Sequence, residues 1–157
     1  MLDPELYYGK KADGSNIPNN GWQKGNYMSC LLNPHWQKWE KYITAAYARA
    51  GYDGVFADLF PYIQGEGVLC SCDYCKEAWR VYSTERFGEA KPFPERAINP
   101  ETTEGREFFQ FRLEKLSDFI KLLQNEGRKY NPCLLYTSPC RFRALRPRKG
   151  TIRRNLI

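Results

Sequence analysis

The sequence predicts an α/β fold made of βα units around a parallel sheet. Three segments carry apolar residues at the three- and four-residue spacing of helices. Between the first two of them, residues 55–57 form a short apolar run without polar alternation, which is typical of a strand covered on both faces. Because one strand cannot form a stable sheet, the alternation indicates about two to three βα units of a larger α/β protein.

Residues 1–32 are predicted to form a loop, since the stretch ADGSNIPNNG is dense in turn-forming residues. A helix is expected to follow. Asn33 suits its N-cap and Pro34 its first turn, where a missing N–H costs nothing. Gly51 is the expected left-handed stop. The predicted inward face of this helix comprises Trp36, Trp39, Ile43, Ala46, Tyr47 and Ala50.

Two further helices are predicted, over residues 73–87 and 103–126. Gly88 and Gly127 are their expected ends. Another strand is expected after the sequence RKYNP at residues 128–132. The predicted inward residues of the two helices are Ala78, Trp79, Tyr82, Phe87, Phe108, Phe109, Leu113, Leu116, Phe119, Ile120 and Leu123.

Residues 133–157 carry the basic excess of the chain. They hold seven Lys and Arg and no acidic residue, whereas the formal net charge of the whole chain is +6. The sequence CLLYTS at residues 133–138 matches the translation of a transposon-end adapter used in sequencing libraries. We therefore predict one domain over residues 1–132, followed by a non-native read-through. The alternative is a genuine basic tail that binds anionic partners.

Composition excludes some classes of partner. Without the tail, 24 − 7 = 17 basic residues stand against 18 acidic ones, so no basic face for nucleic acid is expected. No apolar stretch approaches the roughly 20 residues that span a membrane. The opening MLDPELYYGKKADG lacks the apolar core of a signal peptide, so no membrane partner is predicted. The oligomeric state is left open.

The cysteines outside the tail have three possible uses. Cys72 and Cys75 form a C-x-x-C pair at a helix start, as in redox sites, but Cys70 and Cys30 would then have no role. Disulfides suit small secreted scaffolds, whereas this chain has enough apolar residues for a core. Four thiolates around a structural zinc ion fit best, with C-x-C-x-x-C supplying three ligands and Cys30 the fourth. Thiolate zinc favours a reducing, cytoplasmic setting, although zinc sites also occur outside cells.

Three motifs resemble a class of (β/α)8-barrel glycoside hydrolases. They are C-x-x-N-P at residues 30–34, GYDGVFADLF at 51–60 and CSCDYCKEAWRVYSTERFG at 70–88. The chain is similar here to the family 42 β-galactosidases and to the related group called hypothetical glycosyl hydrolase 6. The resemblance covers residues 3–132 and implies a fragment of a (β/α)8 barrel.

The resemblance also implies a zinc site and a place for the chemistry. Family 42 members carry a four-cysteine zinc cluster in the order that Cys30, Cys70, Cys72 and Cys75 follow here. Their catalytic acid/base stands in an Asn-Glu pair after the strand, where this chain has Asp58 and Leu59. An aspartate in this place is typical of the hypothetical group, which makes Asp58 a candidate acid/base or substrate-binding carboxylate.

Other residues near Asp58 are weaker candidates. Glu66 lies on the loop over the same expected face, and Phe60 and Tyr62 could stack on a sugar ring. Glycoside hydrolysis needs a second carboxylate, and in the resembled barrels the nucleophile comes from a later strand. The sequence therefore predicts a fragment of a glycoside hydrolase that acts on carbohydrate but is inactive alone. The alternative is a zinc-binding module without enzymatic activity.

Overall fold

The computed structural model describes residues 3–18, 26–56, 69–94 and 99–137. Within these ranges the protein is a mixed α/β structure with little strand. Its elements are the 3₁₀ turn η1 (Pro4–Leu6), α1 (Pro34–Arg49), β1 (Gly54–Phe56), α2 (Asp73–Phe87), α3 (Thr103–Arg128) and β2 (Leu135–Thr137).

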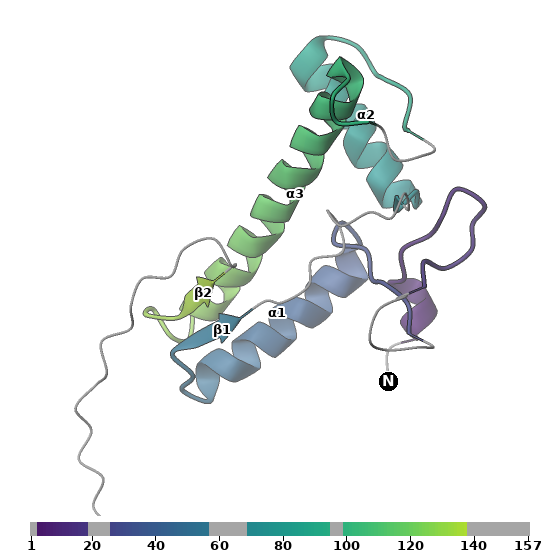
Figure 1. Cartoon of the computed structure of the whole chain (residues 1–157). Coiled ribbons are helices and arrows are strands. Elements are labelled where there is room, and N and C mark those ends of the chain that lie inside the picture. The colour runs from purple at the N-terminus through teal and green to yellow at the C-terminus, as the bar shows by residue number, and fades with distance from the viewer. Residues whose placement is uncertain (1–2, 19–25, 57–68, 95–98, 138–157) are drawn as a thin grey trace, which may run out of the picture.

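The long helix α3 lies beside both of the other helices (Figure 1). Its first half lies beside α2, and its second half lies beside α1, which runs in the same direction. The two strands lie where α1 and α3 end, and the N-terminal segment lies where α1 and α2 begin. In the described part of the chain, no helix combines the length and the hydropathy needed to span a membrane.

The strands β1 and β2 pair in parallel, with Val55 opposite Tyr136. The predicted strand is confirmed over residues 55–56, whereas Ala57 lies outside the described residues. The expectation that both faces are covered is wrong here, because Phe56 is 60% exposed. β2 is the strand expected after RKYNP, and it falls within the segment assigned to the tail. This pairing does not test whether residues 133–157 are native, so the boundary at residue 132 stays a prediction.

Helix α1 begins and ends as predicted. The Asn33 side chain accepts a hydrogen bond from the His35 backbone N–H at 2.9 Å and donates to the Leu6 carbonyl at 2.7 Å. Gly51 follows the helix with φ of 83°, a left-handed conformation that favours glycine.

The predicted inward face of α1 is wrong in most of its members. Trp36 and Ile43 are half-buried, whereas Trp39, Ala46, Tyr47 and Ala50 are exposed. The residues that α1 buries are Thr44, Ala45 and Ala48. The reason lies on α3, where a Cβ built on Gly127 would come within 3.1 Å of the Thr44 methyl. Such a close approach of two helices admits small residues and leaves the large aromatic side chains outside.

Helix α2 packs on α3 through aromatic rings. Trp79 is 3% exposed and makes edge-on contacts with Phe108 and Phe111, with ring centroids 5.1 and 5.3 Å apart. Its indole N–H donates to the Pro92 carbonyl at 3.0 Å. All four predicted inward residues of α2 belong to this aromatic cluster, so the predicted face is confirmed. Gly88 also ends the helix as predicted, with φ of 82°.

Helix α3 differs from the prediction in its end and in part of its face. It continues to Arg128, so Gly127 is not its stop. Gly127 is buried instead, and a Cβ there would meet the Leu134 side chain at 2.2 Å. Phe109 and Leu113 are exposed, contrary to the prediction. The other predicted inward residues of α3, Phe108, Leu116, Phe119, Ile120 and Leu123, are buried or half-buried.

The N-terminal segment is more ordered than the predicted loop. Three isolated antiparallel bridges join Tyr8 to Ser29, Lys10 to Asn16 and Pro18 to Tyr27. Backbone hydrogen bonds continue the pattern, from Gly9 N–H to the Met28 carbonyl at 2.7 Å and from Ile17 N–H to the Gly9 carbonyl at 3.0 Å. The turn residues therefore connect short extended pieces that pair with one another.

Candidate metal centre

The sulfur atoms of Cys30, Cys70, Cys72 and Cys75 lie together in the structure. All four are within 4.8 Å of one another, and none is in a disulfide. Cys72 Sγ lies 3.5 Å from the sulfurs of both Cys30 and Cys70, and Cys30 Sγ lies 3.5 Å from that of Cys75. Four thiolates bound to zinc at about 2.3 Å in a tetrahedron are about 3.8 Å apart, so the cluster has the size of such a site.

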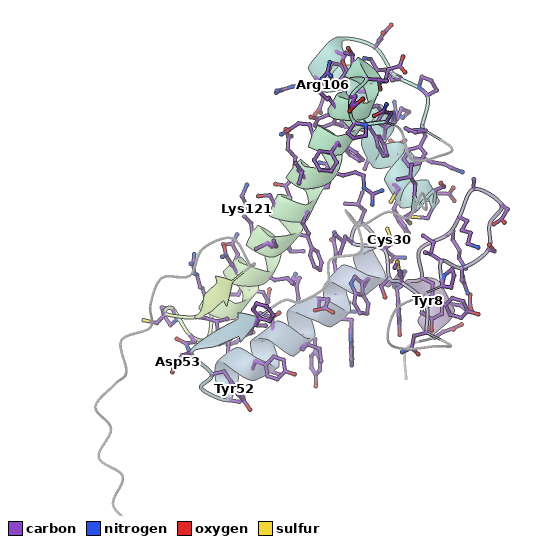
Figure 2. The ribbon with its side chains drawn as sticks, in the orientation of Figure 1. Tyr8, Cys30, Tyr52, Asp53, Arg106 and Lys121 are labelled. Atoms are coloured by element: carbon purple, nitrogen blue, oxygen red, sulfur yellow. The ribbon has the colours of Figure 1, made fainter. Side chains whose placement is uncertain are left out.

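Cys30 is held at the start of α1. Its backbone N–H donates to the Tyr7 carbonyl at 3.0 Å, which fixes it to the N-terminal bridges. Its carbonyl accepts from the Asn33 N–H at 3.1 Å, so the chain turns directly into the cap of α1. The C-x-x-N-P sequence thus places a ligand one turn before a helix (Figure 2).

The other three cysteines lie at the start of α2. Cys72 is the N-cap residue, and its carbonyl accepts from the N–H groups of Cys75 and Lys76, each at 3.0 Å. This first turn brings Cys75 back to the side of Cys72. Cys70 is positioned from the other direction, because the Ser71 N–H donates to the Lys10 carbonyl at 2.7 Å.

The cluster lies in an apolar environment. Cys30 and Cys75 are 1% exposed, and Cys70 is 6% exposed, whereas Cys72 is partly exposed. The buried residues packed with them in one hydrophobic cluster are Ile17, Leu31, Phe119 and Leu123.

Gly9 allows the N-terminal segment to approach the cluster. A Cβ on Gly9 would lie 3.3 Å from the Cys70 sulfur and 3.1 Å from the Ile17 side chain. Neither Gly9 nor Ile17 is predicted from the sequence, because the segment is expected to form a loop. The signal available was the single apolar Ile17 within a polar stretch.

The protonation of the four thiols is mutually dependent. Hydrogen bonding with Cys30 lowers the pKa of Cys70, and the same contact raises the pKa of Cys30. The pKa of Cys72 is lowered, mainly through Cys30, whereas the pKa of Cys75 is raised. Protons are therefore shared, and four thiolates at this spacing would repel one another. A divalent cation at the centre removes this repulsion and allows all four ligands to deprotonate.

The donor set fits a soft metal ion in a closed site. Thiolates select zinc, copper(I) or iron over magnesium and calcium. Among the described residues, no histidine, aspartate or glutamate joins the group. Four protein ligands leave no position for water or substrate, which is the pattern of structural rather than catalytic metal sites.

The predicted catalytic and sugar-binding residues lie outside the described part of the chain. These are Asp58, Phe60, Tyr62 and Glu66. The structure therefore brings together the four predicted metal ligands, while the roles of these other residues stay predictions. Asp58 follows the last residue of β1, Phe56, by two positions.

Comparisons of the chain with protein-family models, with curated proteins and with solved structures found no match.

Proposed function

We propose that Cys30, Cys70, Cys72 and Cys75 bind one zinc ion in a structural centre. The observation that carries the proposal is the convergence of four sulfurs, none in a disulfide, within 4.8 Å of one another. Zinc suits the site because it accepts four thiolates in a tetrahedron and takes no part in redox chemistry.

The centre would join three parts of the chain that are distant from one another in the sequence or in the fold. Cys30 belongs to the N-terminal bridges and the start of α1, whereas Cys72 and Cys75 begin α2. Binding of structural zinc supplies on the order of 10 kcal/mol in small domains, and that energy stabilises the folded state. Helices α1 and α2 would then be fixed to each other at their first turns.

Native mass spectrometry of the purified chain tests the zinc assignment. We expect one zinc ion per chain, retained in the Cys133→Ser variant and bound more weakly in Cys30→Ser. Cys133 is a suitable control because it is free and exposed. Folded wild-type protein that contains no metal, even after incubation with zinc, would contradict the proposal.

We further propose that the centre serves a segment of a (β/α)8 barrel of glycoside-hydrolase type. The proposal is supported by the resemblance of residues 30–34, 51–60 and 70–88 to that class and by the order of α1, β1, α2 and α3 along the chain. Barrel enzymes place their site at the carboxyl ends of the strands, and Asp58 stands two positions after the last residue of β1 in the sequence. Asp58 would act as acid/base or hold a sugar hydroxyl, and the second carboxylate would come from another strand.

Long-read sequencing of the encoding locus across codon 133 tests this second proposal. A reading frame that continues past RKYNP into further βα units with a strand-end carboxylate would support the hydrolase. In that completed enzyme, Asp58→Asn should abolish turnover of nitrophenyl glycosides and leave the zinc content unchanged. Unchanged kinetics would remove Asp58 from the site.

The alternative is a zinc-binding module without enzymatic activity. One observation favours it: the cysteine cluster packs with buried apolar side chains from the N-terminal segment, the start of α1 and α3, namely Ile17, Leu31, Phe119 and Leu123. A locus that encodes residues 133–157 as printed and then stops would support the module and contradict the hydrolase.

A further inference from the structure

A cavity of about 240 Å³ lies against the metal centre. Its lining includes Lys10 and Lys11 from the N-terminal segment, and Cys72, Asp73 and Lys76 from the start of α2. The cavity is therefore formed by the two segments that the cysteine cluster joins.

Cys72 is the one ligand of the four that the cavity reaches. It is partly exposed, whereas Cys30, Cys70 and Cys75 are buried. It is also the only one of the four that lines the cavity. A molecule that entered the cavity would meet this sulfur first.

The cavity carries more positive than negative charge. Three lysines and one acidic residue, Asp73, line it. Lys10 is bound by Glu5 at 3.2 Å and by the Asn16 side chain. Within the described chain, no ion pair engages Lys11 or Lys76. The cavity also lies at the N-terminal end of α2, where the backbone adds further positive potential.

We propose that Cys72 is a covalent modification site of the metal centre and that the lysine-lined cavity selects small anionic electrophiles for it. This inference rests on the proposed metal centre, because a bound metal keeps the Cys72 sulfur as a thiolate. In the reaction a sulfur lone pair attacks the electrophilic carbon, a carbon–sulfur bond forms, and the leaving group departs with its bonding electrons. No proton is transferred and no external oxidant is required.

Modification has a consequence for the fold. The thioether that forms is neutral and is a weaker ligand for zinc than a thiolate. The centre would then open at its exposed ligand, while the three buried cysteines remain in place. Cys72 would thus couple the presence of an anionic electrophile to the loss of the metal.

Alkylation of the metal-loaded full chain tests the proposal. Iodoacetate and iodoacetamide have nearly the same size and differ in charge, so the ratio of their rates reports the potential at the sulfur. Peptide mass spectrometry assigns each modification, and Cys133 serves as an internal reference because it is exposed. The variants are Lys11→Gln/Lys76→Gln and, as a control with the same change in net charge, Lys115→Gln/Lys121→Gln on α3.

We expect Cys72 to be the first cluster cysteine that reacts. At Cys72, the ratio of the iodoacetate rate to the iodoacetamide rate should fall about tenfold in Lys11→Gln/Lys76→Gln, since each nearby charge contributes about threefold under water-like screening. The same ratio should be unchanged in the control variant, and at Cys133 it should be unchanged in every variant. Zinc should leave in step with the modification of Cys72.

Two results would overturn the proposal. One is earlier modification of Cys30, Cys70 or Cys75, and the other is a rate ratio at Cys72 that the cavity lysines do not affect. Native mass spectrometry before the reaction separates these failures from a failure of the metal centre, since a chain without metal would contradict the zinc assignment itself. A Lys11→Gln/Lys76→Gln variant that loses its metal before alkylation would assign these lysines to metal retention and also overturn the proposal.

Discussion

The two ends of α1 contrast in how completely they are packed. Where α1 begins, the four cysteines, the N-terminal bridges and the start of α2 enclose one another, and three of the four sulfurs are buried. Where α1 ends, β1 and β2 form a sheet of two short parallel strands, and Phe56 is exposed. Figure 2 shows this separation, with Cys30 at one end of α1 and Tyr52 at the other.

The contrast teaches where the stability of the described chain resides. A parallel pair of three-residue strands is marginal by itself. The helices therefore depend on contacts with one another and, in our proposal, on the metal bound by the cysteine cluster. We expect perturbations at the cysteine end to be large and those at the strand end to be smaller.

Removing a cysteine of the proposed metal centre should have the largest effect on stability. Cys30→Ser removes one of four ligands and leaves three crowded sulfurs, so the free energy of unfolding should fall by about 5 kcal/mol or more. Cys133→Ser should change it by less than about 0.5 kcal/mol, because Cys133 is free and exposed. Urea unfolding followed by circular dichroism, in the presence of zinc, measures both. Equal stability of the two variants would show that the cluster does not stabilise the fold.

Disrupting the aromatic contact between α2 and α3 should have the second-largest effect on stability. Trp79→Ala removes the central ring of a buried cluster and a hydrogen bond to Pro92, at an expected cost of about 3–5 kcal/mol. Trp39→Ala is the matched control, since Trp39 is exposed, and it should cost less than about 1 kcal/mol. Thermal and urea unfolding of both variants provide the measurement. A larger effect at Trp39 would restore the α1 face predicted from the sequence.

Gly127→Ala tests the packing of α3 against Leu134, and the sign of the change in the free energy of unfolding gives the answer. In an open helix this change stabilises by about 1 kcal/mol. Here the new methyl group would overlap Leu134 at 2.2 Å, so a loss of about 1–3 kcal/mol is expected. Leu134 lies in the segment interpreted as read-through, and the effect therefore reports whether that residue packs as described. A stabilised variant would show that it does not.

Glu40→Gln should have a small stabilising effect near neutral pH. Burial raises the pKa of Glu40, so the folded state favours the protonated carboxyl group. That stability is present at low pH and is lost as the pH rises through the raised pKa. Glutamine cannot ionise, so the variant should gain up to about 1 kcal/mol at neutral pH and lose the advantage in acid. Urea unfolding at several pH values measures the difference, and a destabilised variant at neutral pH would contradict the assignment.

Glu126→Gln should have the smallest effect on the free energy of unfolding, and it should destabilise the protein, whereas Glu40→Gln stabilises it. A hydrogen bond with Lys129 and the charge of Lys41 hold the pKa of Glu126 below its usual range. The stabilisation is present above the ordinary carboxyl pKa and is lost as the pH falls through the lowered value. The variant should lose at most about 0.5 kcal/mol at neutral pH, because solvent at the exposed ends of Lys41 and Lys129 screens the two ion pairs. The same pH series applies, and a loss that persists in acid would point to packing instead.

The features of the fold that the sequence predicts correctly are those with local causes. The Asn33 cap and the glycines at 51 and 88 act through their own backbone, and α2 has the predicted boundaries. The convergence of the four cysteines could be predicted because their spacing is typical of thiolate metal sites.

The features that the sequence does not predict depend on contacts between distant segments. The buried face of α1 is determined by the close approach of Gly127, more than seventy positions later. Tyr47 and Thr44 both fit a helical pattern, and only the position of α3 decides which of them is buried. The N-terminal bridges likewise pair residues such as Tyr8 and Ser29, which no local pattern connects.

X-ray absorption at the zinc edge identifies the atoms bound to the metal. We expect one shell of four sulfur atoms at about 2.3 Å from zinc in the wild-type chain. In Cys30→Ser the shell should contain three sulfurs and one lighter atom. A wild-type spectrum with nitrogen or oxygen ligands in the first shell, or a folded chain without zinc, would contradict the four-cysteine centre.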